Sequence, residues 1–253
     1  MIIAREDGAS IAYHRSAGRA PGVVFLTGFK SDMTGEKAMG LEDFCRRRGQ
    51  AFLRFDYFGH GDSSGRFDDG TIGRWADDAV FAIDRLTEGP LVLVGSSMGG
   101  WLMLLAALQR PDRIAGLVGI AAAPDFTQDL IEDALTPEQK AILESTGTVT
   151  VPNAYDPADP FIVRQDFIDE GRNHLLLDTA IAIDCPVRLL HGINDEDVPY
   201  ATSLRLAENL RTDDVEITLI KNGDHRLSTP TDITRLTETL ETLLNRLDPP
   251  SDS

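Results

Sequence analysis

Residues 91–100 read Leu91-Val92-Leu93-Val94-Gly95-Ser96-Ser97-Met98-Gly99-Gly100, and a helix-like run over residues 101–109 follows directly. An apolar strand, a Gly-x-Ser-x-Gly motif and a helix in this order are typical of a nucleophile elbow, a sharp turn that presents a reactive serine. The small residues Gly95 and Gly99 leave room for the strained backbone that such a turn requires. The stretch therefore predicts that Ser97, in the third position of the motif, is a nucleophile.

A serine hydroxyl is a weak nucleophile at neutral pH, so Ser97 needs a base. Of the five histidines in the chain, His225 follows the apolar run Val215 to Ile220 in a short loop, before a helix that should begin at Pro230. We expect His225 to be this base. The other four histidines do not occupy such a position; these are His14, His60, His174 and His191. Of these, His191 lies at the end of a buried strand and is expected to be structural.

The base needs an acid that orients its ring, and two aspartates, Asp195 and Asp197, follow the apolar run Val187 to Leu190. We favour Asp195, because it occupies the acid position of the pattern His-Gly-x-x-Asp-x-x-Val-Pro, and Asp197 remains the alternative. Asp224 is too close to His225 in sequence to reach behind the ring. Serine, acid and histidine then follow the chain order of α/β-hydrolases.

The developing oxyanion needs hydrogen-bond donors, and the backbone supplies both candidates. The elbow provides the N–H group of Met98, the residue after the nucleophile. The loop after the first buried strand, residues 26–30, is expected to provide the N–H group of Phe29.

The alternation of elements predicts the fold class. Residues 2–15 read as a hairpin around Asp7-Gly8, a dipeptide suited to a tight turn. Continuous apolar runs suit strands that helices cover on both faces, and helix-like stretches separate them. We therefore expect one α/β domain, residues 1–253, with a mainly parallel central sheet, an N-terminal hairpin and flanking helices. The apolar runs are Val23 to Leu26, Ala51 to Phe55, Leu91 to Val94, Leu117 to Ile120, Val187 to Leu190 and Val215 to Ile220.

The segment from Pro124 to Asp184 breaks this alternation. It has no clear strand, but it contains helix-like pieces over residues 128–135, 137–143 and 161–170. Long segments between core elements often cover a functional site. We interpret residues 124–184 as an inserted helical lid, whose apolar side chains suggest a hydrophobic acyl group.

Composition excludes several classes of function. The chain has 24 Lys and Arg against 41 Asp and Glu, a formal net charge of −17, so nucleic acid is not an expected partner. No run approaches the roughly 18 apolar residues of a membrane span. The first seven residues contain no leader-like pattern. These features predict a cytoplasmic location.

No metal and no cofactor are expected from motif spacing. Cys45 and Cys185 are expected to be buried thiols, and no Cys and His cluster has metal-ligand spacing. The Gly-rich segment 56–65 lacks the Gly-x-Gly-x-x-Gly fingerprint of dinucleotide sites. We interpret it as a structural turn in which Asp56 bonds local amides.

Four runs together resemble a known family: residues 95–104, 54–57, 185–192 and 224–226. They resemble the α/β-hydrolase superfamily of serine hydrolases and, within it, the mitochondrial palmitoyl-protein thioesterases, also called mycophenolic acid acyl-glucuronide esterases. The similarity spans about residues 21–247 and is weakest in the lid. It implies that the nucleophile, acid and base fall on Ser97, Asp195 and His225. It also implies that the substrates are S-acylated protein cysteines or acyl glucuronides. The lack of a transit peptide suggests either a bacterial-type relative or a trimmed chain.

Together these features predict a serine hydrolase that cleaves acyl thioesters or esters through an acyl-enzyme on Ser97. Its expected partner is a small-molecule substrate or an S-acylated protein or peptide. Two alternatives remain at this point: a carbon–carbon bond hydrolase of the same fold, and a non-catalytic ligand-binding homologue.

Overall fold

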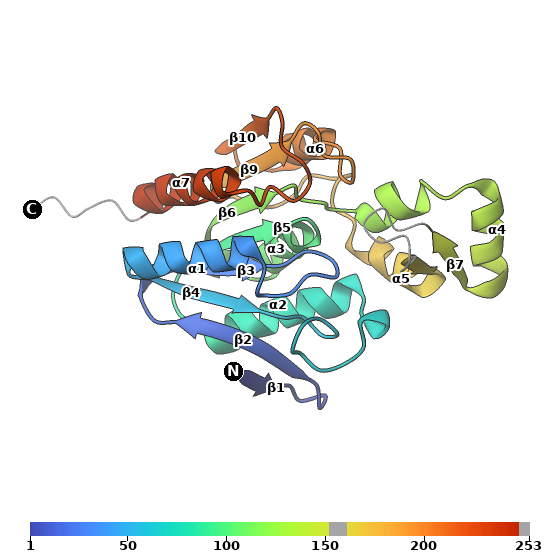
Figure 1. The fold of residues 1–253 in the computed structure, drawn as a ribbon, viewed down its shortest axis with the longest axis horizontal. Coiled ribbons are helices and arrows are strands. Elements are labelled where there is room, and N and C mark those ends of the chain that lie inside the picture. Colours follow the sequence, from blue (N-terminus) through green and yellow to red (C-terminus); the bar gives the residue numbers. More distant parts are fainter. Residues whose placement is uncertain (152–160, 248–253) are drawn as a thin grey trace, which may run out of the picture.

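An eight-stranded sheet forms the centre of the computed structural model, which describes residues 1–151 and 161–247 (Figure 1). The strand order is β1-β2-β4-β3-β5-β6-β9-β10. β1 and β2 form the antiparallel N-terminal hairpin, and β2 pairs antiparallel with β4, whereas all other neighbours are parallel. The bounds are β1 (Ile2–Ala4), β2 (Ser10–Ser16), β3 (Arg19–Leu26), β4 (Gln50–Phe55), β5 (Leu91–Ser96), β6 (Ile114–Ile120), β9 (Val187–Gly192) and β10 (Val215–Ile220).

Helices cover both faces of this sheet, which explains the continuous apolar strands. α1 (Glu36–Arg48) and α7 (Pro230–Leu247) pack on one face, against Val92 and Val94 of β5. α2 (Ile72–Leu86), α3 (Met98–Gln109) and α6 (Ala201–Asn209) pack on the other, where Leu91 and Leu93 point. Successive strand residues thus enter opposite core layers.

The start of α7 follows from local hydrogen bonds. The Thr229 hydroxyl accepts from the Asp232 amide (3.3 Å), and the Asp232 carboxylate accepts from the Thr229 amide (3.2 Å). This reciprocal cap, with Pro230 in the first helical position, fixes where the helix begins. The loop between β10 and α7, which carries His225, is therefore short.

The segment between β6 and β9 contains the predicted helices but also two strands, which corrects the expectation of a lid without strands. Its elements are a π-helical turn (Thr127–Glu132), α4 (Pro137–Thr146), β7 (Thr148–Val151), β8 (Phe161–Arg164), α5 (Gln165–Gly171) and a 3₁₀ turn (Arg172–His174). β7 and β8 pair antiparallel, with Val149 opposite Val163. The residues of the predicted lid between these strands, 152–160, lie outside the described residues.

Strand propensity and packing explain why residues 161–164 are a strand and not the start of the predicted helix. Ile162 and Val163 are β-branched, which disfavours a helix and suits a paired strand. Val163 is completely buried in a small separate core with Leu135, Leu143, Val149 and Ile168. In Figure 1 this part lies to the right of the sheet. We keep the name lid for residues 124–184.

One buried carboxylate joins the two ends of the lid. Asp125 has a positive φ of 60° and is 2% exposed. Its carboxylate accepts hydrogen bonds from the amides of Leu176 (2.9 Å) and Leu177 (2.7 Å). Burial raises the pKa of Asp125, against these amide hydrogen bonds. The Asp125 carboxylate therefore ties the start of the lid to residues near its end.

None of the helices within the described ranges has the length and apolarity needed to cross a bilayer. Cys45 is buried as expected, whereas Cys185 is half-buried, and both are free thiols. Burial raises the pKa of Cys45 to about 12 and that of Cys185 to about 11, so neither is a reactive thiolate at neutral pH.

Candidate active site

Ser97 lies in the turn between β5 and α3, and its backbone is strained. Its φ of 55° and ψ of −121° are unusual for a residue with a side chain. A Cβ atom at Gly95 would lie 2.3 Å from the Gly99 carbonyl oxygen, and one at Gly99 would lie 2.2 Å from the Leu26 carbonyl oxygen. Both glycines are therefore required for the turn to pass this close to its neighbours.

His225 faces Ser97 from the loop after β10. Its Nε2 lies 3.0 Å from Ser97 Oγ, and its Nδ1 lies 2.9 Å from Asp195 Oδ2. An ionised carboxylate only accepts hydrogen bonds, so Nδ1 carries a proton and the lone pair of Nε2 accepts from the serine hydroxyl. The structure thus brings together Ser97, His225 and Asp195, the three predicted catalytic residues.

Close packing of two strand-end loops brings His225 and Asp195 together. The Asn194 amide donates to the Gly223 carbonyl (3.0 Å), and a Cβ atom at Gly192 would lie only 2.3 Å from that same oxygen. Glycine at position 192 therefore allows the loop after β9 to lie directly against the loop after β10.

The Asp195 side chain is completely buried and accepts hydrogen bonds at both oxygens. Oδ1 accepts from the amides of Asp197 (3.0 Å) and Val198 (2.8 Å), and Oδ2 accepts from His225 and from His191 Nε2 (3.1 Å). Burial pushes the pKa of Asp195 upward, but the hydrogen bonds from His191, His225 and the Val198 amide outweigh it. They hold the pKa well below its usual range, so the group is a carboxylate at neutral pH.

His191 contacts the acid, a contact that the sequence did not indicate. The ring is fully buried, Nδ1 lies 2.7 Å from Ser203 Oγ, and Nε2 lies 2.9 Å from the Val198 carbonyl oxygen. The expectation of a satisfied structural histidine is correct, yet the ring also supports Asp195. No periodicity or spacing reveals that the strand end and the following loop fold back on each other.

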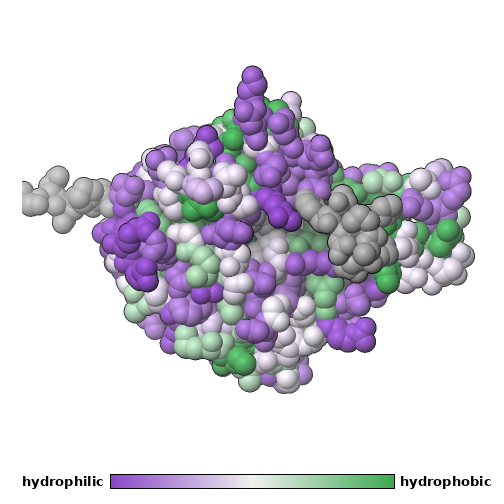
Figure 2. Space-filling view, in the orientation of Figure 1, coloured by the Kyte–Doolittle hydropathy of each residue, from purple (hydrophilic) through white to green (hydrophobic). Residues whose placement is uncertain are grey.

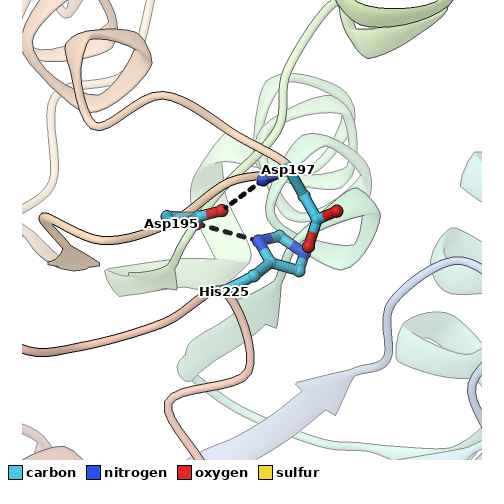
Figure 3. Close-up of side chains that lie close together, drawn as sticks. All are labelled: Asp195, Asp197 and His225. Atoms are coloured by element: carbon cyan, nitrogen blue, oxygen red, sulfur yellow. Dashed lines mark hydrogen bonds and ion pairs between the residues drawn. The ribbon is translucent and has the colours of Figure 1, made fainter. Parts of the chain in front are cut away.

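Asp197, the alternative acid, lies on a different edge of the base. Figure 3 shows Asp195 beside one ring nitrogen of His225 and the Asp197 carboxylate near the other edge of the ring. One side-chain oxygen or nitrogen atom from each of Asp195, Asp197 and His225 lies within 4.8 Å of the others. Among the described residues, no other three His, Cys, Asp or Glu side chains come this close together.

The two predicted oxyanion donors belong to residues that line the same cleft as Ser97. Phe29 and Met98 both do so, and a Cβ atom at Gly28 would lie 3.4 Å from Ser97 Cβ, so this loop passes close to the nucleophile. Among the backbone hydrogen bonds of the described residues outside helices and strands, neither amide has an acceptor. Their role at an oxyanion stays a prediction.

The Gly-rich turn supports the loop that carries Phe29. The buried Asp56 carboxylate accepts from the Asp62 amide (3.0 Å), as expected for a structural turn, and also from the Met33 amide (2.7 Å). Met33 follows the loop that carries Phe29, so this second bond fixes one end of that loop.

The cleft next to Ser97 has a volume of about 700 Å³, and both apolar and charged side chains line it. Phe29 forms the centre of the apolar wall, with ring centroids 5.3 Å from Phe161 of the lid and 5.6 Å from Phe126. Other apolar residues that line the cleft include Leu130, Ile131 and Val151. The charged lining residues are Lys30, Asp32, Glu36, Lys37, Asp197 and Arg226.

Burial lowers the pKa of Lys37, whose ammonium group donates to the Arg226 carbonyl oxygen. On the outside, the lid exposes Ile142 (48%) and Ile162 (58%). Figure 2 shows hydrophobic patches among polar residues on the visible face of the lid.

A mainly parallel sheet with a strained serine after a central strand, and with a histidine and an aspartate from two later strand ends, defines the architecture of α/β-hydrolases. The family model described as alpha/beta hydrolase fold matches residues 21–208, and the chain belongs to this family. The predicted fold class and the predicted class of serine hydrolase are thereby confirmed.

Similar relatives carry a more specific name. A mouse protein named palmitoyl-protein thioesterase ABHD10, mitochondrial, is 42% identical over 245 residues, which are 96% of this chain and 82% of the mouse protein. The human protein of that name is 40% identical over 243 residues, 96% of this chain and 79% of its own.

Two solved structures agree with these sequence relatives. Alpha/beta hydrolase domain-containing protein 10 from mouse has a TM-score of 0.93 at 41% identity and covers 98% of this chain and 99% of its own. A putative hydrolase from Agrobacterium vitis S4 has a TM-score of 0.89 at 39% identity. The match covers 96% of this chain and 97% of the Agrobacterium chain. The resemblance seen in the sequence is therefore confirmed.

The expectation of a cytoplasmic location is wrong. The relatives from mouse, cattle and human that match 96–97% of this chain are named as mitochondrial proteins. The expectation relied on the lack of a leader-like pattern in the first seven residues, and such a lack does not show in which compartment the folded protein works.

Proposed function

We propose that the protein hydrolyses acyl thioesters or esters through an acyl-enzyme on Ser97. The observation that carries the proposal is the chain of contacts from Asp195 to His225 Nδ1 (2.9 Å) and from His225 Nε2 to Ser97 Oγ (3.0 Å). In this order the acid fixes the ring and the ring activates the serine.

In the first half of the reaction, His225 takes the proton of Ser97 as Oγ attacks the acyl carbonyl carbon. The amides of Phe29 and Met98 donate hydrogen bonds to the oxyanion that forms. The tetrahedral intermediate collapses, His225 gives its proton to the departing thiol or alcohol, and the acyl group stays on Ser97 as an ester. Water then attacks that ester with His225 again as base, which releases the acid and restores the serine.

The acyl group is a hydrophobic one. The wall formed by Phe29, Phe126 and Phe161 offers an apolar surface beside Ser97. Relatives that share 40–42% of their sequence with this chain are named palmitoyl-protein thioesterases. An S-acylated cysteine of a protein or peptide is therefore the proposed acyl donor. Acyl glucuronides, whose leaving group carries a carboxylate, are the second class of acyl donor in this proposal. Three cationic side chains, Lys30, Lys37 and Arg226, line the cleft together with three acidic ones.

The test begins with a fluorophosphonate probe, which labels activated serines. We expect labelling of the wild type and of Ser96→Ala, a control at the neighbouring serine, and none of Ser97→Ala. Hydrolysis rates on p-nitrophenyl esters and S-acyl cysteines of matched chain length then compare the two leaving groups. Folded but unlabelled wild type would contradict the activated serine. Turnover of carbon–carbon substrates with no turnover of either acyl donor would favour the alternative hydrolase.

A further inference from the structure

Lys37, in the first turn of α1, binds the loop that carries the catalytic base. Its ammonium group donates a hydrogen bond to the carbonyl oxygen of Arg226, the residue directly after His225. Lys37, His225 and Arg226 all line the cleft beside Ser97. An element that is far away in sequence thus holds the backbone next to the ring that activates the nucleophile.

Packing of α1 against α7 fixes the position from which Lys37 reaches this loop. A Cβ atom at Gly40 would lie 2.6 Å from Cγ2 of Ile233 in α7, so glycine at position 40 lets the two helices meet closely. Ala38, the neighbour of Lys37, is buried in the same core cluster as Leu227 of the loop. The start of α1 and the loop after β10 are therefore held in place relative to each other.

The backbone after His225 has a conformation that needs support. Leu227 has a positive φ of 42°, which is rare for a residue with a bulky side chain. Its side chain is buried, and its amide donates to the Asp224 carboxylate (3.0 Å). The carbonyl that Lys37 contacts belongs to the planar peptide group joining Arg226 to Leu227, so this bond fixes the orientation of that group.

Burial of the Lys37 ammonium group costs free energy, which its partners offset. Burial lowers the pKa of Lys37. The acidic groups that favour its charged form are Glu36, Asp224 and Asp232, and the Arg226 guanidinium opposes it. A buried ammonium group is tolerated when it is hydrogen-bonded, and a charged donor forms a stronger hydrogen bond than a neutral one. The contact with the Arg226 carbonyl is therefore a strong tie.

We propose that Lys37 is a positioning residue for His225: by holding the Arg226 carbonyl, it keeps Nε2 of the base directed at Ser97 Oγ. This inference rests on the proposed function. Asp195 holds one edge of the His225 ring (2.9 Å), whereas Lys37 holds the backbone to which the ring is attached. The base must keep its 3.0 Å contact with Ser97 Oγ for proton transfer, and a displacement of about 1 Å can lower a rate about a hundredfold.

Lys37→Met, which keeps a long side chain but removes the donor, tests the proposal. We expect kcat on a p-nitrophenyl ester to fall roughly tenfold with KM unchanged, because one charged hydrogen bond is lost. Fluorophosphonate labelling of Ser97 should slow by a similar factor. Lys37→Arg keeps a charged donor and should retain most of both rates. Lys221→Met is the matched control, because it removes the same charge from an exposed position at the start of the same loop and should behave like the wild type.

The two readouts separate positioning from substrate binding. If Lys37 instead binds a carboxylate of the substrate, Lys37→Met should raise KM for acyl glucuronides and leave the labelling rate unchanged, which would overturn the proposed role. Equal losses in folded Lys37→Met and Lys37→Arg would overturn it as well, and the thermal unfolding midpoint of each variant checks folding. Labelled wild type with equally fast labelling of Lys37→Met would contradict only the role of Lys37, whereas folded wild type without any labelling would contradict the proposed function itself.

Discussion

Two aspartates lie beside the ring of His225, and their positions around the ring give them different roles. Asp195 is buried, accepts at both oxygens and holds Nδ1, whereas Asp197 lies at the other edge of the ring. Only an acceptor on Nδ1 keeps the proton there, and this leaves the Nε2 lone pair directed at Ser97.

We therefore expect Asp195→Asn to lower kcat by about 10⁴-fold, because an amide can donate to Nδ1 and stabilise the wrong tautomer. Asp197→Asn should cause a far smaller loss. Steady-state kinetics on one p-nitrophenyl ester compares the two, and a larger loss in Asp197→Asn would reverse the assignment of the acid. The thermal unfolding midpoint of each variant controls for misfolding.

His191 is the second residue to test at this scale. Its Nε2 contacts the same oxygen of Asp195 that His225 uses, so it acts through the acid as a positioning residue. A hydrogen bond to a charged group contributes about 1.5–3 kcal/mol, so losing part of that contribution corresponds to a drop in kcat of roughly tenfold to a hundredfold. We expect His191→Gln to lower kcat in this range with KM unchanged. Ser203→Ala, which removes the partner of Nδ1, should give a weaker loss of the same kind. A change in KM alone would contradict positioning.

Among the elements, β8 of the lid presents two neighbouring residues with opposite exposure. Phe161 faces the cleft and its ring lies 5.3 Å from that of Phe29, whereas Ile162 is 58% exposed. This difference follows from the alternation of side chains along a strand.

Phe161→Ala should therefore weaken hydrolysis of long acyl chains. Loss of a large apolar contact corresponds to about 1.5–3 kcal/mol, so kcat/KM for a palmitoyl donor should fall roughly tenfold to a hundredfold. The rate for an acetyl donor should change much less. Ile162→Ala is the matched control on the outer face, and an equal loss for both chain lengths in Phe161→Ala would contradict an acyl-binding wall.

The contact between α5 and α2 gives a stability prediction that depends on pH. Glu170 accepts from the Gly73 amide (3.1 Å) and lies 2.6 Å from His174 Nε2. The hydrogen bond to Glu170 raises the pKa of His174 above 6.5. Burial alone would raise the pKa of Glu170, but the bonds from His174 and Gly73 lower it below 4.5. The contribution of ionised Glu170 to the free energy of unfolding is lost as pH falls through the lowered pKa of Glu170. The contribution of protonated His174 is lost as pH rises through the raised pKa of His174.

Glu170→Gln should therefore destabilise the protein most between about pH 4.5 and 6.5, by about 1 kcal/mol, and less at pH 8 and above. Urea unfolding at a series of pH values measures this difference. Asp166→Asn, at an exposed ion pair on the same helix, should show little effect at any pH. A Glu170→Gln deficit that grows from pH 6 to pH 8 would contradict the assigned pair.

Over the whole molecule, the elements that the sequence predicts well are those whose own pattern determines them. The buried strands, the elbow and the capped start of α7 follow from local composition, because their neighbours impose no competing demand. The β7–β8 hairpin was not predicted from the sequence, because its four-residue strands are too short to show the alternation of polar and apolar residues. The supporting contact of His191 and the position of Asp197 also required the fold, because they depend on how two loops pack and not on residue type.

The clamp at Asp125 bears on how enzymes of this family diverge. Both ends of the inserted segment meet at one buried carboxylate, and part of the segment has a core of its own around Val163. The part of the segment around Val163 can therefore change in sequence without altering the register of the sheet beneath it, whereas Phe126 and Phe167 belong to the main core. Substrate range can then evolve separately from the catalytic scaffold, provided that the junction at Asp125 and the contacts of Phe167 and Glu170 with the scaffold are kept.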